Sequence, residues 1–285
     1  MMSSVPKTWL VGLIGRGIGG SRSPQMHERE AASLGLQLVY RLIDFDRLGI
    51  DDNDLGKILA MVEAMGFAGV NITYPFKQTV IEYLDTLSPD AMALGAVNTV
   101  RFAGGKREGF NTDWSGFATC VQTQLGDVIC GKVAQIGAGG AGSATAYAAL
   151  QKSANEVCIY DRDFAKADAL VTRLAPVFPG QSIVRSVTPQ DAIAGAAGVI
   201  QASPVGMASL PGLPFDLALM KADQWLADII YFPQETELVE KAKERGIRAI
   251  GGSSMAIHQA AGAFEIFTAH VPDTNRMLAE FGAIV

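Results

Sequence analysis

A glycine-rich turn in the middle of the chain constrains the fold more than any other feature. The apolar run Val133-Ala134-Gln135-Ile136 leads into Gly137-Ala138-Gly139-Gly140-Ala141-Gly142, and an alanine-rich stretch of helical character follows. A second apolar run, Val157-Cys158-Ile159-Tyr160, ends in Asp161, about 24 residues after Gly137. Strand, G-x-G-x-x-G, helix, strand and acidic residue is the order that a dinucleotide-binding βαβ unit requires.

Each part of this turn has a physical purpose. The first two glycines permit a tight turn and a close approach of the backbone to a pyrophosphate, and Gly142 lets the helix pack on the strand. The helix N-terminus then offers free N–H groups and the positive end of a dipole. We therefore predict a bound nicotinamide or related dinucleotide, although a ligand-free turn in an α/β core would share part of the pattern.

Composition excludes several classes of protein. The 285 residues are 49% hydrophobic and 18% charged, which suits a globular chain with two modest domains. The net charge of −6 and the pI near 5.1 give no reason to expect a nucleic-acid or anionic-membrane partner.

The cysteines are typical of a protein in a reducing compartment. The chain has three cysteines, Cys120, Cys130 and Cys158, and three histidines, and neither set shows the spacing of a metal site. No metal site is therefore expected. The apolar run from Trp9 to Ile14 is too short for a signal sequence, and no stretch approaches the length of a membrane span. These features predict a cytoplasmic location.

Hydrophobic periodicity predicts an α/β protein with two domains. The tail helices have no strand partner of their own, so we expect them to pack back on the first domain. The domains would comprise residues 1–113 with 250–285, and residues 114–249, the second a Rossmann-type doubly wound parallel sheet. Strands are predicted at 10–14, 37–45, 69–73, 97–102, 109–112, 133–136, 157–160, 182–186, 198–202, 225–230 and 248–250. Helices are predicted at 23–34, 54–65, 76–84 with Pro75 at the first position, 114–125, 254–270 and 273–281.

Several separate motifs occur in a fixed order along nearly the whole chain. They are Ser21-Arg22-Ser23-Pro24, Asn71-Ile72-Thr73-Tyr74-Pro75-Phe76-Lys77, Gly95-Ala96-Val97-Asn98-Thr99, Asn111-Thr112-Asp113, Ala202-Ser203-Pro204-Val205-Gly206-Met207, Asp228 to Pro233, and Met255 to Ala260.

This ordered set resembles the shikimate dehydrogenase family, and most of all its NAD-dependent quinate/shikimate branch. The resemblance implies reversible, stereospecific reduction of 3-dehydroshikimate to shikimate. It also implies that the first domain binds the substrate and carries the catalytic group, while the second binds the dinucleotide.

The family's catalytic pair maps onto Lys77 and Asp113. A ketone that receives a hydride becomes an alkoxide and needs a proton, which a lysine beside a carboxylate can supply. Lys77 follows a predicted strand end, where clefts of α/β proteins form. Asp113 is expected to bind the substrate and to tune the lysine; a nearby charge would raise the lysine pKa and burial would lower it.

Other positions map to substrate contacts. Ser21 and Ser23 resemble the family's carboxylate-binding hydroxyl pair, although two serines before a proline can also be a helix cap and turn. Further expected substrate contacts are hydroxyl binding by Thr73, Asn98 and Gln259, and a phenol from Tyr231.

The choice of nicotinamide rests on the residues after the second strand. NADP-dependent members of the family usually have Asn-Arg-Thr where this chain has Asp161-Arg162-Asp163. Two carboxylates would repel a 2′-phosphate, so NAD is predicted over NADP, although Arg162 could reach a phosphate or stack on adenine. The expected cofactor contacts are Gly137, Ala138, Gly139, Gly140, Ala141, Gly142, Asp161, Arg162 and Met207.

The sequence motifs define the family more closely than they define the substrate or the biological role. Quinate-using relatives often have threonine where this chain has Ser23, which favours shikimate, yet the rest of the chain favours the quinate/shikimate branch. A catalytically silent nicotinamide-binding module is the alternative from another class. Biosynthesis through the shikimate pathway and degradation both stay open, and a homodimer is compatible with the sequence.

Overall fold

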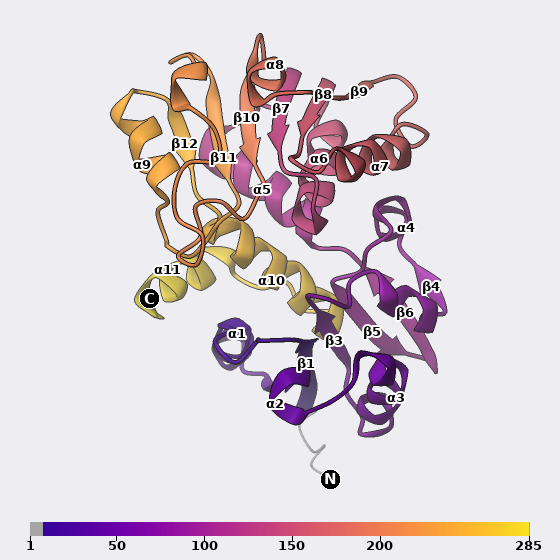
Figure 1. The fold of residues 1–285 in the computed structure, drawn as a ribbon. Coiled ribbons are helices and arrows are strands. Elements are labelled where there is room, and N and C mark those ends of the chain that lie inside the picture. The colour runs from indigo at the N-terminus through magenta and orange to yellow at the C-terminus, as the bar shows by residue number, and fades with distance from the viewer. Residues whose placement is uncertain (1–7, 285) are drawn as a thin grey trace, which may run out of the picture. The chain divides into compact units, whose positions relative to one another are not determined.

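The computed structural model describes residues 8–284, and the chain divides into two compact units (Figure 1). Unit 1 comprises Met1–Thr112 and Gln259–Val285, and unit 2 comprises Asp113–His258. One boundary follows Thr112, and the other falls within the long helix α10 (Ser253–Thr268).

Unit 1 is built on a mixed six-stranded sheet of order β2-β1-β3-β5-β6-β4. The strand β1 is parallel to both of its neighbours, whereas β5 is antiparallel to β3 and to β6. This sheet places the carboxyl ends of β1, β2 and β3 at one edge. The strands are β1 (Thr8–Gly15), β2 (Gln37–Asp44), β3 (Gly69–Ile72), β4 (Thr86–Leu87), β5 (Thr99–Ala103) and β6 (Lys106–Phe110).

Helices cover both faces of this sheet. Local sequence fixes several helix starts, since Pro24 lies in the first turn of α1 and Ser88 caps α4 by accepting a hydrogen bond from Ala91 N. The helices of unit 1, besides the end of α10, are α1 (Ser23–Ser33), α2 (Phe45–Leu48), η1 (Asp52–Asp54), α3 (Leu55–Ala64), η2 (Thr79–Tyr83), α4 (Pro89–Leu94) and α11 (Thr274–Ile284).

Alternating residues of β1 and its neighbours pack into two hydrophobic clusters. On one face Val11 and Leu13 pack with Phe264 and Phe267 of α10, so the tail does return to the sheet formed by the first part of the chain. On the other face, Ile14 and residues of β3 pack with α3. The burial of these apolar side chains fixes the register of the sheet.

The predicted helix over 76–84 is wrong. The peptide between Tyr74 and Pro75 is cis, residues 74–78 form turns, and only the 3₁₀ helix η2 follows. The reason lies in tertiary bonding: Thr73 O accepts a hydrogen bond from Phe76 N (2.9 Å), and Lys77 O accepts one from Val97 N (2.8 Å). A carbonyl that bonds a neighbouring segment is not available to a regular helix. Sequence analysis also missed β4 and α4, which lie between 84 and 97.

Unit 2 contains a six-stranded sheet of order β12-β11-β10-β7-β8-β9, in which all neighbours are parallel. This is the strand order of a doubly wound dinucleotide-binding fold, as the sequence predicted. The strands are β7 (Gly131–Ile136), β8 (Ala154–Tyr160), β9 (Ser182–Arg185), β10 (Gly198–Gln201), β11 (Trp225–Asp228) and β12 (Arg248–Ile250).

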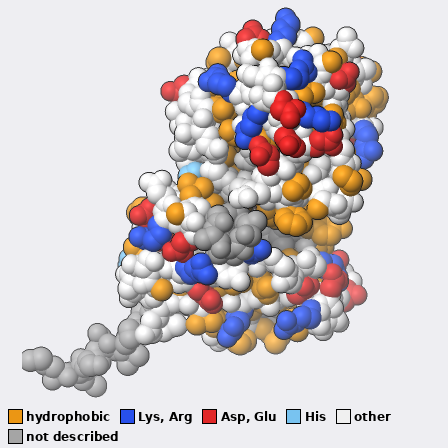
Figure 2. All heavy atoms as spheres, turned by 90° about the vertical axis from the view of Figure 1, so that its left-hand side faces the viewer, with side chains coloured by type: hydrophobic (Ala, Val, Ile, Leu, Met, Phe, Trp, Pro, Cys, Tyr) orange, Lys and Arg blue, Asp and Glu red, His pale blue; other side chains and the backbone are white. Residues whose placement is uncertain are grey.

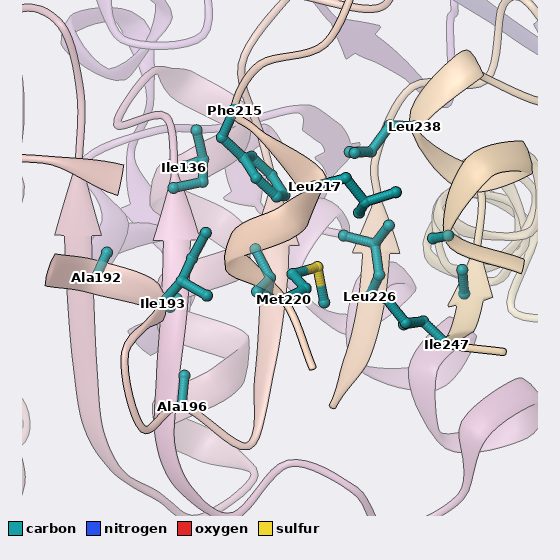
Figure 3. Packing of buried hydrophobic residues seen from close by; sticks show 14 of the residues in the cluster. Ile136, Ala192, Ile193, Ala196, Phe215, Leu217, Met220, Leu226, Leu238 and Ile247 are labelled. Atoms are coloured by element: carbon teal, nitrogen blue, oxygen red, sulfur yellow. The ribbon is translucent and has the colours of Figure 1, made fainter. Parts of the chain in front are cut away.

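One face of this sheet packs on α8, η3 and α9. Ile136, Ile193, Phe215, Leu226 and Leu238 meet there in a buried apolar cluster, seen from close by in Figure 3. The helices of unit 2 are α5 (Asp113–Leu125), α6 (Gly140–Gln151), α7 (Phe164–Leu174), α8 (Pro189–Ile193), η3 (Leu217–Leu219), α9 (Glu237–Glu244) and the start of α10.

The surface that carries α9 is mixed in charge. Acidic and basic side chains alternate there (Figure 2), and they include the ion pairs Lys241–Glu237 (2.6 Å) and Lys243–Glu235 (2.5 Å). This face therefore lacks the continuous positive charge that phosphate backbones require. Among the residues that the structure describes, no helix is both long and apolar enough to cross a membrane.

Candidate active site

In unit 1, backbone hydrogen bonds join the loops that follow β1 and β3. Ile14 O accepts from Thr73 N (3.0 Å), and Tyr74 O accepts from Arg16 N (3.0 Å). Gly15 makes this approach possible, because a Cβ at that position would lie only 2.4 Å from Cγ2 of Thr73. The predicted hydroxyl-binding residue Thr73 is thus held at the carboxyl end of the sheet.

The loop after β1 carries both predicted carboxylate-binding serines. Ser21 Oγ donates to Ser23 Oγ over 3.2 Å, and Ser21 Oγ accepts from Ser23 N over 3.3 Å. Both side chains are half-buried, and α1 begins at Ser23 without a side-chain cap. Two neighbouring hydroxyls that can donate hydrogen bonds form an arrangement that suits a carboxylate.

Asp44, at the end of β2, fixes the start of this loop. Its Oδ2 accepts a hydrogen bond from Ile18 N (3.0 Å), and its Oδ1 accepts from Gly17 N (3.1 Å). Sequence analysis assigned no role to this buried carboxylate. A lone acid directly after an apolar strand was the only signal available.

Lys77 and Asn98 are brought together through the backbone. Lys77 O accepts from Val97 N, and Asn98 O accepts from Ile72 N (2.8 Å), so both residues border the end of β3. The Lys77 side chain is half-buried, whereas Asn98 is buried. Unit 1 therefore gathers Thr73, Lys77 and Asn98 at one place.

Thr112 extends this cluster toward α10. Asn98 Oδ1 accepts from Thr112 N (2.8 Å), and Asn98 Nδ2 donates to Thr112 Oγ1 (2.9 Å). A Cβ at Gly262 of α10 would lie 3.3 Å from Cγ2 of Thr112. Gln259, half-buried, lies three residues before Gly262 on the same helix, so it faces the same region of unit 1.

Asp113 follows Thr112 directly and opens α5 as a buried residue, 3% exposed. An acid at the first position of a helix is favourably placed with respect to the helix dipole. Asp113 thus directly follows the residue that is hydrogen-bonded to the Asn98 side chain.

In unit 2, the glycines of the turn differ in how closely other atoms approach them. Gly137 has a φ of +107°, and a Cβ there would meet the carbonyl carbon of Ala202 at 2.6 Å. A Cβ at Gly142 would lie 2.4 Å from Gly137 O. By contrast, a Cβ at Gly139 or Gly140 would meet nothing within 4 Å, and both residues are exposed.

This turn fits a dinucleotide phosphate. Gly139 is the N-cap of α6 and supplies no side-chain hydrogen bond to the first N–H groups of the helix. Gly137 and Gly142 are required by packing, and Gly139 and Gly140 keep space for a ligand.

Asp161 closes the turn from the end of β8. Its Oδ2 accepts from Ala138 N (2.8 Å), and its Oδ1 accepts from Asp163 N (2.9 Å). A carboxylate has about four acceptor sites, so lone pairs remain for ribose hydroxyls. Arg162 is exposed, and Asp163 caps α7 by accepting from Ala165 N (3.1 Å), a role that the sequence analysis did not assign.

Two buried glutamines hold the loops around this turn. Gln135 donates to Gly137 O (2.9 Å) and Gly142 O (2.8 Å) and accepts from Thr145 Oγ1. Gln201 donates to Val205 O (2.7 Å) in the loop that carries Met207, which is 40% exposed. Polar residues at the ends of apolar strands were the sequence signal for both.

Tyr231 lies on the loop after β11 and is 57% exposed. Asp228 shapes this loop, because it accepts hydrogen bonds from Ile230 N (3.0 Å) and Thr236 Oγ1 (2.7 Å). Burial raises the pKa of Asp228 to about 6, although both bonds act in the opposite direction.

His27 is buried beside Tyr40 with ring centroids 4.9 Å apart, and its Nδ1 has no hydrogen-bond partner. Among residues 8–284, no group of three or more His, Cys, Asp or Glu side chains is placed to hold a metal ion.

Comparison with known proteins finds relatives along almost the whole chain. The family model of the shikimate dehydrogenase substrate binding domain matches residues 13–100. The chain is 43% identical to a shikimate dehydrogenase (NADP(+)) of Arthrobacter sp. (strain FB24), over 100% of this chain and 98% of that protein. It is 40% identical to a quinate/shikimate dehydrogenase (NAD(+)) of Corynebacterium glutamicum (strain R), over 95% and 97%.

A solved structure agrees with the fold throughout. The quinate dehydrogenase of Corynebacterium glutamicum in complex with NAD superposes with a TM-score of 0.92 at 39% identity, and the match covers 98% of this chain and 99% of that one. The predicted family resemblance and fold class are thereby confirmed.

Proposed function

Because the chain belongs to the shikimate dehydrogenase family, we propose that it interconverts shikimate and 3-dehydroshikimate with a nicotinamide cofactor. The observation that carries this proposal is the cluster in unit 1, where backbone bonds gather Thr73, Lys77 and Asn98 at the end of β3. A lysine close to residues that bind hydroxyl groups suits proton transfer on a polyhydroxylated acid.

We assign cofactor binding to unit 2. The N–H groups at the start of α6 would hold the pyrophosphate, and Asp161 would accept hydrogen bonds from the ribose. Arg162 in the loop after β8 and Met207 in the loop after β10 are the further proposed cofactor contacts. When bound, the nicotinamide supplies or removes the hydride.

Lys77 is the proposed proton donor and acceptor. During reduction the ketone oxygen becomes an alkoxide, and the Lys77 ammonium gives it a proton; in the reverse direction the neutral amine removes the hydroxyl proton. Asp113 is proposed as the substrate-binding acid of this pair, as in the family pattern.

The remaining contacts orient the acid. Ser21 and Ser23 would bind the substrate carboxylate through their hydroxyls. Thr73, Asn98 and Gln259 would bind ring hydroxyls, and Tyr231 would contribute its phenol to the substrate. These are all neutral groups, so the substrate charge is matched by dipoles and by Lys77.

NAD is the proposed cofactor in preference to NADP. Asp161 and Asp163 place two carboxylates after β8, where a 2′-phosphate would be repelled. At 4 Å, one pair of like charges costs about 1 kcal/mol in water and about 4 kcal/mol at an effective dielectric of 20. The 40% identity to a relative named as NAD-dependent is compatible with this preference.

Quinate is the second candidate substrate. The structural match to a quinate dehydrogenase favours it, while Ser23 in place of threonine favours shikimate. The methyl group that distinguishes threonine from serine has only a small effect on specificity. We therefore propose shikimate as the better substrate and quinate as the slower one.

Two lysine variants test the proposed role of Lys77. Lys77→Met removes the proposed proton donor, and shikimate oxidation should fall by about 10²–10⁴-fold, the usual contribution of a general acid–base group. Cofactor binding, followed by fluorescence, should not change. Lys106→Met is the matched control, because Lys106 is exposed at the start of β6. Equal activity of the two variants would contradict the role of Lys77.

A further inference from the structure

A short glycine-rich loop joins β1 to the two serines that are proposed to bind the substrate carboxylate. The segment of this loop between Arg16 and Ser21 is Gly17-Ile18-Gly19-Gly20. Glycine loses more conformational freedom on ordering than any other residue. A segment of this composition therefore places the side chains that follow it accurately only if other groups hold its backbone.

The carboxylate of Asp44, at the end of β2, holds this segment with both of its oxygens. Oδ1 accepts a hydrogen bond from Gly17 N (3.1 Å), and Oδ2 accepts one from Ile18 N (3.0 Å). Two successive N–H groups on one anion form a backbone nest, and the φ of +63° at Gly17 is compatible with such a turn. Asp44 is only 7% exposed, and hydrogen bonds to an ionised acceptor are stronger than those between neutral groups.

The backbone of Ile18 connects Asp44 to the serines. The Ile18 side chain is buried in the apolar cluster that β1 forms with α10. Its N–H group donates to Asp44, and its carbonyl oxygen accepts from Ser21 N over 2.9 Å. Ser21 Oγ in turn donates to Ser23 Oγ and accepts from Ser23 N. Each step from the carboxylate of Asp44 to both hydroxyls is therefore a hydrogen bond or a short piece of backbone.

Arg16, which precedes the segment, is bound to other groups. Its backbone N–H donates to Tyr74 O (3.0 Å), and its guanidinium donates to Asp46 Oδ1 (2.6 Å) and Asp52 Oδ1 (2.7 Å). The positive charge of Arg16 is thus matched by two acids, whereas the proposed carboxylate contacts are neutral hydroxyls. A hydrogen bond from a hydroxyl weakens steeply when its direction is wrong, so the placement of the two serines matters for binding.

We propose that Asp44 is a positioning residue, which holds the segment 17–20 so that the hydroxyls of Ser21 and Ser23 are in place before the substrate carboxylate binds. This inference rests on the proposed function, because it concerns the acid that binds at that site. Asp44 acts through Ile18 and makes no substrate contact in the proposed function. The substrate then does not bear the entropic cost of ordering a glycine-rich loop when it binds.

The first test is the variant Asp44→Asn in the full chain. An amide has one oxygen and one NH₂ group, so in either orientation the NH₂ group faces a backbone N–H. Loss of one positioning hydrogen bond predicts a rise of about three- to tenfold in the KM for shikimate, while kcat and the KM for the cofactor stay within about twofold. Asp51→Asn is the matched control in the same unit, since Asp51 accepts from Asn53 N (2.9 Å) and should leave all three constants unchanged. A merely structural role would lower thermal stability without raising the KM for shikimate alone.

A double-mutant cycle decides whether Asp44 acts through the serines. In a chain that carries both Ser21→Ala and Ser23→Ala, Asp44→Asn should not lower kcat/KM for shikimate further, because the hydroxyls that it positions are gone. The bond from Ser21 N to Ile18 O involves only backbone, so these alanines leave it in place. An equal loss with and without the serines, or an unchanged KM in Asp44→Asn, would overturn this inference alone. A parent chain that turns over neither shikimate nor quinate would overturn the proposed function and this inference with it.

Amide hydrogen exchange of the full chain gives a second readout that does not depend on turnover. The N–H groups of Gly17, Ile18 and Ser21 should exchange slowly without shikimate, and Asp44→Asn should speed their exchange about tenfold, whereas Asp51→Asn should not. If Asp44→Asn fails to fold, the parent chain alone decides. Exchange of these three amides that is fast without shikimate and slow with it would overturn the proposal, because the substrate rather than Asp44 would then order the loop.

Discussion

The carboxylate of Glu30 on α1 holds the guanidinium of Arg276 on α11 through two hydrogen bonds. Nε donates to Oε2 over 2.9 Å, and Nη2 donates to Oε1 over 2.6 Å. Glu30 is 1% exposed, and its Oε1 also accepts from Asp273 N (2.8 Å). The same helix begins at Ser23, so this contact anchors the element that carries the proposed carboxylate site.

Loss of the Glu30 charge should weaken the fold. Glu30→Gln keeps the shape but removes the charge-assisted bonds, and we expect a loss of about 2 kcal/mol in the free energy of unfolding in urea. Asp168→Asn is the control, because its pair with Arg185 is exposed and should contribute less than about 1 kcal/mol. Equal effects of both variants would contradict a structural role for Glu30.

His27 should make stability depend on pH. Burial lowers its pKa from 6.5 to about 3, so between these values the unfolded chain binds a proton that the folded chain does not. Stability is therefore fully present above about pH 6.5 and falls as the pH decreases, by up to about 1.4 kcal/mol per pH unit. Asp228 contributes in the opposite sense between about pH 4 and 6, because its folded pKa is raised.

Two histidine variants separate the contribution of His27 to the pH dependence of stability from that of other groups. Urea unfolding at pH 7 and pH 5 should show a smaller loss on acidification for His27→Leu than for the parent chain. His270→Gln, which changes an exposed histidine, should lose as much as the parent. A His27→Leu chain that also loses as much as the parent would refute the assignment.

The glycines of the turn should separate into two kinds. Gly137→Ala places a methyl group against the backbone of Ala202 at a φ of +107°, which should cost about 1–3 kcal/mol of stability. Gly139→Ala meets no protein atom, so stability should hold while the KM for the dinucleotide rises about tenfold, or about 1.4 kcal/mol. Thermal melting and steady-state kinetics distinguish the two; an unchanged dinucleotide KM in Gly139→Ala would argue against a phosphate at that residue.

Asp161 should control the choice of nicotinamide. Asp161→Asn removes one of the two charges proposed to repel a 2′-phosphate, and the NAD-to-NADP ratio of kcat/KM should fall by about tenfold or more. Asp168→Asn is the matched control, since Asp168 is an exposed acid on α7 that pairs with Arg185 and has no proposed cofactor contact. A ratio that stays constant in Asp161→Asn would show that another residue reads the cofactor.

The long elements and the glycine-rich turn were predictable because each depends on a local pattern. Alternation along β1 and the parallel strands of unit 2 follow from burial, and the turn follows from the steric needs of Gly137 and Gly142. The stretch after Thr73 was not predictable, because Lys77 O bonds Val97 N, about twenty residues away. Local propensity contains no information on such a partner.

The same distinction applies to the site. Residues in ordered motifs, such as Lys77 and Asn98, could be named in advance, and the structure places them together. Asp44 could not, because its role arises from hydrogen bonds to a loop that follows another strand. Asp163 was given a charge role, yet its position as a helix cap became visible only in the structure.

The most direct test of the central claim is a steady-state assay of the purified chain at alkaline pH with four substrate pairs. Shikimate and quinate are each combined with NAD⁺ and with NADP⁺, and formation of the reduced nicotinamide is followed. The proposed function predicts turnover mainly with shikimate and NAD⁺, slower turnover with quinate, and little with NADP⁺. Nicotinamide binding without turnover in any of the four combinations would contradict it.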